Sequence, residues 1–107
     1  MINEEKLDEV LLTLGYDDFN RGTTYLRECV KEYTPGDKIT ALYARVGRLH
    51  GTTGSRVERA IRHVQRKAWG RCPMLTRVLY FGNSVDPDTG PTNCELIARL
   101  ERICHQD

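Results

Sequence analysis

The residues with the strongest chemical character are arginines, which recur through the middle of the chain. Over residues 45–77, nine side chains are basic and only Glu58 is acidic, giving a formal charge of +8. Residues 1–44 carry a formal charge of −4 and residues 78–107 carry a formal charge of −3. The net charge of the whole chain is therefore only +1, although its middle segment is strongly basic. The planar arginine guanidinium bonds guanine O6 and N7 together or clamps a phosphate. This pattern predicts a polyanionic partner, namely double-stranded DNA.

The basic side chains share one face if residues 55–69 form a helix. At about 100° per residue, apolar side chains fall on one stripe of that helix, and arginines fall on the opposite face. The apolar stripe holds Val57, Ala60, Ile61, Val64 and Ala68, and the opposite face holds Ser55, Arg59, Arg62 and Arg66. A helix with such a face fits the major groove of DNA, which accepts an α-helix.

Position along the helix divides these residues into two roles. Residues near the start of a recognition helix reach base edges most readily, which favours Arg56, Glu58 and Arg59 for base reading. Glu58 either accepts a hydrogen bond from a cytosine amino group or pairs with Arg62 one turn later. The predicted contacts to the DNA backbone come from Thr52, Thr53, Ser55, Arg62, His63, Arg66 and Lys67.

No catalytic, cofactor or metal site is predicted. The sequence contains no carboxylate pair, nucleophile–base set or phosphate-cradling glycine motif at usable spacing, so we expect no enzyme. The cysteines form no C-x-x-C motif and have no histidine partner at zinc-finger spacing. We interpret them as free, mostly buried thiols in preference to metal ligands or disulfides; they are Cys29, Cys72, Cys94 and Cys104.

The elements that must position the basic face are all helical. Apolar residues recur at helical spacing over 4–15, 25–33, 38–50, 55–69, 74–81 and 92–103, with connectors at 16–22 and 82–91. No segment alternates as a strand does, so we expect an all-α bundle of about six helices. Residues 38–69, with a tight turn at Gly51 to Gly54, predict a helix-turn-helix.

Two further expectations concern helix starts and the tryptophan. Ser55-x-x-Glu58 and Thr92-x-x-Glu95 both match the capping-box pattern, in which a hydroxyl and a carboxylate bond the free amides of a helix start. Trp69 lies within an apolar pattern, and we expect it in the core or at a helix junction and not stacked on a base.

Length and hydropathy define the class of protein. A chain of 107 residues has the size of one domain, so we treat 1–107 as a single DNA-binding unit. Its apolar runs are far shorter than the roughly 18–20 residues that a membrane span needs. The first residues have neither a basic nor an apolar leader segment, so we expect a cytoplasmic protein.

Several strings in the sequence resemble one family. They are T-T-G-S-R-V-E-R-A-I-R-H (Thr52 to His63), A-W-G-R (Ala68 to Arg71), L-Y-F-G (Leu79 to Gly82) and P-T-N-C-E-L-I-A (Pro91 to Ala98). They look like the C-terminal effector domain of the sporulation initiation response regulator of spore-forming bacteria. The resemblance implies a six-helix fold of the winged-helix-like or effector-domain type, with a helix-turn-helix, in a cytoplasmic protein associated with the bacterial nucleoid. It further implies sequence-specific binding at promoter boxes, and activation or repression through RNA polymerase. It also implies that base-reading positions match Arg56, Glu58 and Arg59.

The sequence departs from the family pattern in two places. Family members usually carry a receiver domain with a phosphoacceptor aspartate ahead of this domain, and we expect no receiver domain within this sequence. The loop Asp86-Pro87-Asp88-Thr89-Gly90 has acids where the family often has lysines, so we expect no phosphate contact from it. Helix-turn-helix proteins usually read paired half-sites, which makes a homodimer on DNA an open expectation. The alternative function is a protein-interaction module whose basic helix docks an acidic protein.

Overall fold

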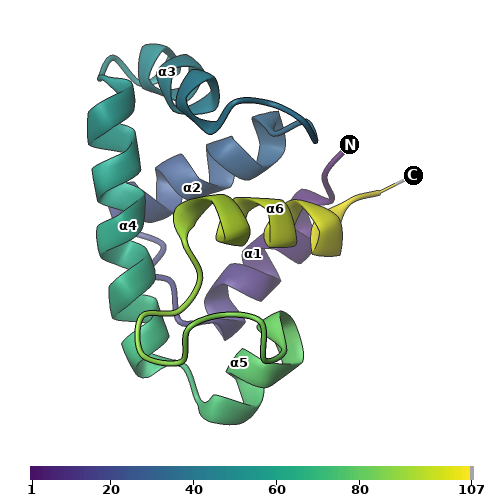
Figure 1. Cartoon of the computed structure of the whole chain (residues 1–107). Helices are drawn as coiled ribbons and strands as arrows, with labels where there is room; N and C mark the ends of the chain where they lie inside the picture. Colours follow the sequence, from purple (N-terminus) through teal and green to yellow (C-terminus); the bar gives the residue numbers. More distant parts are fainter. Residues whose placement is uncertain (107) are drawn as a thin grey trace.

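Six amphipathic segments fold into helices in the computed structural model, which describes residues 1–106 (Figure 1). The helices are α1 (Glu4–Thr13), α2 (Arg21–Glu32), α3 (Ile39–Leu49), α4 (Gly54–Arg71), α5 (Met74–Phe81) and α6 (Asn93–Cys104). Within residues 1–106 no β-strand forms, and only two isolated bridges occur. The expected all-α bundle is confirmed, and the described residues supply no β-hairpin wing.

The core is mainly aliphatic and lies between α4 and the helices that pack on it. The long α4 runs along one side of the molecule, with α3 across its first turns and α2 and α6 against its middle (Figure 1). Burial of each large aliphatic side chain stabilises the fold by about 1.5–3 kcal/mol. The fully buried members include Leu7, Leu26, Leu42, Val57, Ile61, Leu96, Ile97 and Leu100.

The connection between α3 and α4 is tight because two glycines permit it. Gly51 has φ +67°, in the left-handed region that favours glycine. A Cβ at Gly47 would lie 2.9 Å from the carbonyl oxygen of Thr52, so only glycine lets the turn pass this close to α3. The two helices therefore have the order and the short connection expected of a helix-turn-helix.

Two helix starts test the capping predictions, and a third differs from a predicted boundary. Thr92 and Glu95 form the predicted capping box at α6. The predicted box at Ser55 is wrong: Thr53 is the N-cap of α4, and its hydroxyl accepts a hydrogen bond from the Arg56 amide at 3.2 Å. A cap residue needs extended backbone, which Thr53 has, whereas Ser55 already lies inside the helix. Asn20 caps α2, so this helix begins at Arg21, inside the predicted connector 16–22.

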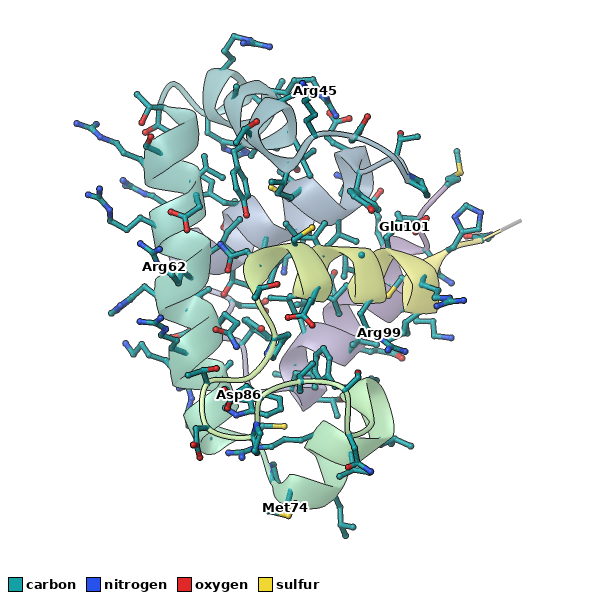
Figure 2. All side chains as sticks on the ribbon, viewed as in Figure 1. Arg45, Arg62, Met74, Asp86, Arg99 and Glu101 are labelled. Atoms are coloured by element: carbon teal, nitrogen blue, oxygen red, sulfur yellow. The ribbon has the colours of Figure 1, made fainter. Side chains whose placement is uncertain are left out.

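Helix α5 has the predicted bounds, but much of its apolar surface faces solvent. Met74, Leu75 and Leu79 are exposed at the lower end of the molecule, where Figure 2 labels Met74. The only charged side chain of α5, Arg77, folds back and donates to the carbonyl oxygens of Cys72 and Trp69. Its guanidinium also lies 4.6 Å from the centre of the Trp69 ring. The outer face of α5 is consequently apolar and uncharged.

Candidate nucleic-acid interface

One face of α4 is held against the core and the other carries basic side chains into solvent. Val57, Ile61, Val64 and Ala68 are buried, as their spacing predicts. On the opposite side the helix has no neighbour, and side chains ending in nitrogen project from it in Figure 2, which labels Arg62. The exposed residues on this side are Ser55, Arg56, Arg59, Arg62, His63, Arg66 and Lys67.

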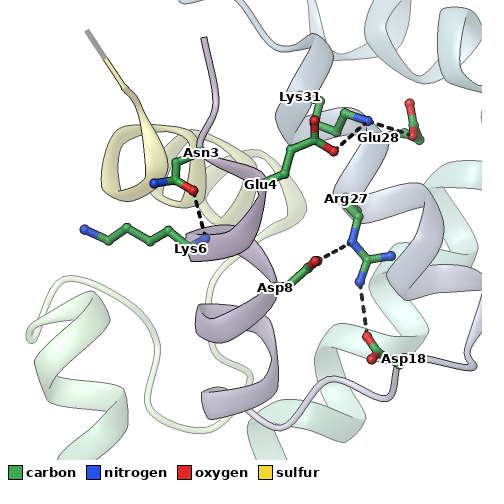
Figure 3. Close-up of polar contacts among 8 residues, drawn as sticks. All are labelled: Asn3, Glu4, Lys6, Asp8, Asp18, Arg27, Glu28 and Lys31. Carbon is green, nitrogen blue, oxygen red and sulfur yellow. Dashed lines mark hydrogen bonds and ion pairs between the residues drawn. The ribbon is translucent and has the colours of Figure 1, made fainter.

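Ion pairs neutralise several cations elsewhere in the chain but few on α4. Figure 3 shows Arg27 between Asp8 and Asp18, at 2.8 and 3.1 Å, and Lys31 between Glu4 and Glu28. Arg45 likewise pairs with Asp37 at 3.3 Å. Among the described residues, only one cation of α4 has a carboxylate partner, which is Arg62. Of the other cations of α4, Arg71 at the end of the helix donates to the backbone oxygen of Gly15 at 2.8 Å. The cations that keep their positive potential for an external anion are Arg56, Arg59, Arg66 and Lys67.

Glu58 makes the intrahelical contact that its spacing allows. Its Oε1 lies 3.1 Å from Nη1 of Arg62, and both side chains are partly exposed. The backbone oxygen of Glu58 accepts a hydrogen bond from the Asn93 side chain at 3.0 Å. The pair orients the Arg62 guanidinium along α4, while the partly exposed Glu58 carboxylate retains a free lone pair for a second donor.

The three predicted hydroxyl contacts lie around the start of α4 but differ in what they already bind. Ser55 is exposed on the first turn, and Thr52 is half-buried in the preceding turn. Thr53 is exposed, and its oxygen already accepts the capping hydrogen bond from the Arg56 amide. Its hydroxyl proton stays available for an anion.

Replacing Thr53 by alanine is expected to lower the free energy of unfolding by about 0.5–2 kcal/mol, because the cap of α4 is lost. Ser55→Ala is the matched control: the Ser55 hydroxyl makes no cap bond, so stability should hardly change. Urea titration followed by circular dichroism measures both. Equal losses in the two variants would restore Ser55 as the cap.

The far end of α4 is tied to the loop that precedes α6. Gln65 donates from Nε2 to the oxygen of Thr89 at 3.2 Å, and Trp69 donates from Nε1 to the oxygen of Pro87 at 3.0 Å. The Trp69 ring is 8% exposed and meets Phe81 edge to face, which confirms its predicted place in the core. These bonds hold the acidic loop beside α4, with Asp86 and Asp88 exposed.

Two residues of this region were missing from the sequence prediction. Gln65 is polar yet 3% exposed, and its position beside the apolar stripe was the available indication. Arg21 lies in the acidic block 1–44, but it is exposed and has no ion pair or side-chain hydrogen bond among residues 1–106. Because the sequence prediction summed the charge over residues 1–44, it overlooked Arg21, a cation that lies near the start of α4 in the folded chain.

The cysteines are free, as predicted. Cys29, Cys72 and Cys104 are buried, and Cys94 is exposed at the start of α6. Burial raises the pKa of the Cys29 thiol to about 12, which keeps it protonated and unreactive near neutral pH. Residues 1–106 contain no group of three or more histidine, cysteine or acidic side chains placed to hold a metal ion. No helix in this range is long and apolar enough to cross a membrane.

Almost the whole chain matches the model of a known protein family. The family described as "Sporulation initiation factor Spo0A C terminal" matches residues 7–103, which spans all but the first turn of α1 and the last residue of α6. The match includes α3, the glycine turn and the basic face of α4. The chain therefore belongs to the family of Spo0A C-terminal domains, the DNA-binding effector domains of sporulation response regulators.

Proposed function

We propose that this protein regulates transcription by placing α4 in the major groove of promoter DNA and reading a specific box there. The observation that carries the proposal is the exposed face of α4, where four cations have no carboxylate partner among residues 1–106. A groove about 12 Å wide accepts one helix, and a helix whose other face is anchored in a core enters it as a rigid unit.

Within this proposal Arg56, Glu58 and Arg59 read bases, since they occupy the first two turns of α4. Arg59 and Arg56 offer bidentate donors to guanine, and Glu58 offers an acceptor to a cytosine amino group. The DNA backbone is held by Thr52, Thr53, Ser55, Arg62, His63, Arg66 and Lys67, which supply affinity without reading sequence.

Two partner contacts complete the proposal. The regulator acts through RNA polymerase, and two copies bind paired half-sites, as helix-turn-helix proteins commonly do. A protein contact needs a surface that stays accessible when α4 lies in the groove. The outer face of α5 meets this requirement, because Met74, Leu75 and Leu79 are exposed and carry no charge.

Selection from a random duplex pool tests the function. We expect one short box to be enriched, and affinity for it to fall steeply with salt because each neutralised phosphate releases counterions. A repeated box at fixed spacing supports a homodimer, and a changed transcript level with purified RNA polymerase supports the polymerase contact. An unenriched pool, with weak binding even at low salt, would instead favour a module that docks an acidic protein.

A further inference from the structure

A polar pocket lies beside the start of α4, on the side where α2 begins. Its walls come from the loop before α2, the first turns of α2, the α3–α4 turn and the first turn of α4. The polar side chains that line it are Arg21, Thr24, His50, Thr52 and Arg56. Two of these, Thr52 and Arg56, already belong to the proposed DNA-binding face, so the pocket continues that face onto α2.

The pocket is rich in hydrogen-bond donors, and none of the described residues that line it carries a carboxylate. The nearest acids along the chain are engaged elsewhere: Asp17 accepts from the Phe19 amide at 3.0 Å, and Asp18 pairs with Arg27 at 3.1 Å. The Arg21 guanidinium is exposed and has no ion pair or hydrogen-bond partner among residues 1–106. The cationic end of Arg21 is therefore available to an anion.

The position of the pocket relative to α4 defines which anion fits. Gly22 packs α2 against Ala60 and Val64, whereas Asn93 joins the start of α6 to Glu58. Glu58 and Ala60 are two residues apart, which places them about 200° apart around the helix axis. The starts of α2 and α6 thus flank α4 on opposite sides. A helix in the major groove has one sugar–phosphate strand on each side.

We propose that this pocket binds a backbone phosphate of the DNA strand that borders α4 on the α2 side, with Arg21 as the principal cation. The inference rests on the proposed function and extends the interface to a second helix. Thr24 and His50 add donors beside Arg21, and the His50 ring is held edge-on against Tyr25 with centroids 5.3 Å apart. The contact recognises the phosphodiester and no base, so it supplies affinity and register only.

Arg21→Ala tests the proposal against the enriched box and a scrambled duplex, by fluorescence anisotropy over a salt series. We expect the affinities for both duplexes to fall by about eightfold at roughly 0.1 M salt. One phosphate contact contributes about 0.9 to the slope of log affinity against log salt concentration, which corresponds to about eightfold in affinity over a tenfold range of salt. The salt slope itself should drop by about 0.9. Arg21→Lys keeps the charge and should keep the parent slope.

Arg102→Ala is the control, because Arg102 is also an exposed arginine but lies in the last turn of α6. Loss of binding to the box alone would overturn the phosphate assignment, since a phosphate contact weakens all sequences alike. An Arg21→Ala protein that binds like the control would also overturn it. If Arg21→Ala binds like the control but Arg59→Ala loses its preference for the enriched box, the proposed function stands and only the phosphate pocket is overturned. A parent protein that binds no duplex specifically would overturn both.

Discussion

Gly22→Ala is expected to lower the free energy of unfolding by about 1–3 kcal/mol, the usual cost of forcing an extra carbon into a packed site. A Cβ at this position would overlap the backbone oxygen of Ala60 and come within 2.9 Å of Val64 Cγ1. Backbone cannot rotate out of the way as a flexible side chain can, so α2 must shift away from α4. Urea or thermal unfolding followed by circular dichroism measures the loss.

Gly70→Ala is the matched control for this prediction. Gly70 also lies in a helix, but a Cβ there would meet no described heavy atom within 4 Å beyond its chain neighbours and the nearby backbone of α4 itself. Alanine should then be neutral or stabilise α4 by up to about 1 kcal/mol, because glycine loses more backbone entropy on folding. If both variants have the parent stability, the close approach of α2 to α4 is wrong. The pocket formed by Arg21 and the α3–α4 turn would then have no fixed geometry.

Arg59→Ala is expected to remove about 1–3 kcal/mol of discrimination between the enriched box and a scrambled duplex. Arg59 is exposed near the start of α4 and has no carboxylate partner among residues 1–106, so its guanidinium is free to bond a base edge. The loss should appear chiefly on the box, because the scrambled duplex never made the base contact. Competition gel shifts with both duplexes give the ratio directly.

Arg66→Ala provides the comparison for Arg59. Arg66 lies about two turns later on the same face and is equally exposed. As a proposed backbone contact, it should weaken both duplexes alike and reduce the salt slope by about one unit. Should Arg59→Ala weaken both duplexes equally as well, Arg59 would be a phosphate contact, and base reading would have to come from Arg56 and Glu58.

The capping boxes show how far local pattern carries a prediction. Thr92-x-x-Glu95 and Ser55-x-x-Glu58 are equivalent as strings, yet only the first forms a box. A cap forms where the backbone is still extended, and the α3–α4 turn places that point at Thr53. The pattern records which side chains can cap, whereas the preceding turn decides where the helix begins.

The sequence by itself determined the helices and the basic face of α4. Both depend on neighbours three and four residues apart, which any helix brings together. The tertiary structure alone decided which cations are available to DNA. Arg27 is neutralised by Asp8, 19 residues away. By contrast Arg21, six residues earlier in the chain and beside the start of α4, has no ion-pair partner in the described part of the chain. Ion pairing depends on which distant segments meet, and this is fixed by packing between helices and not by local periodicity.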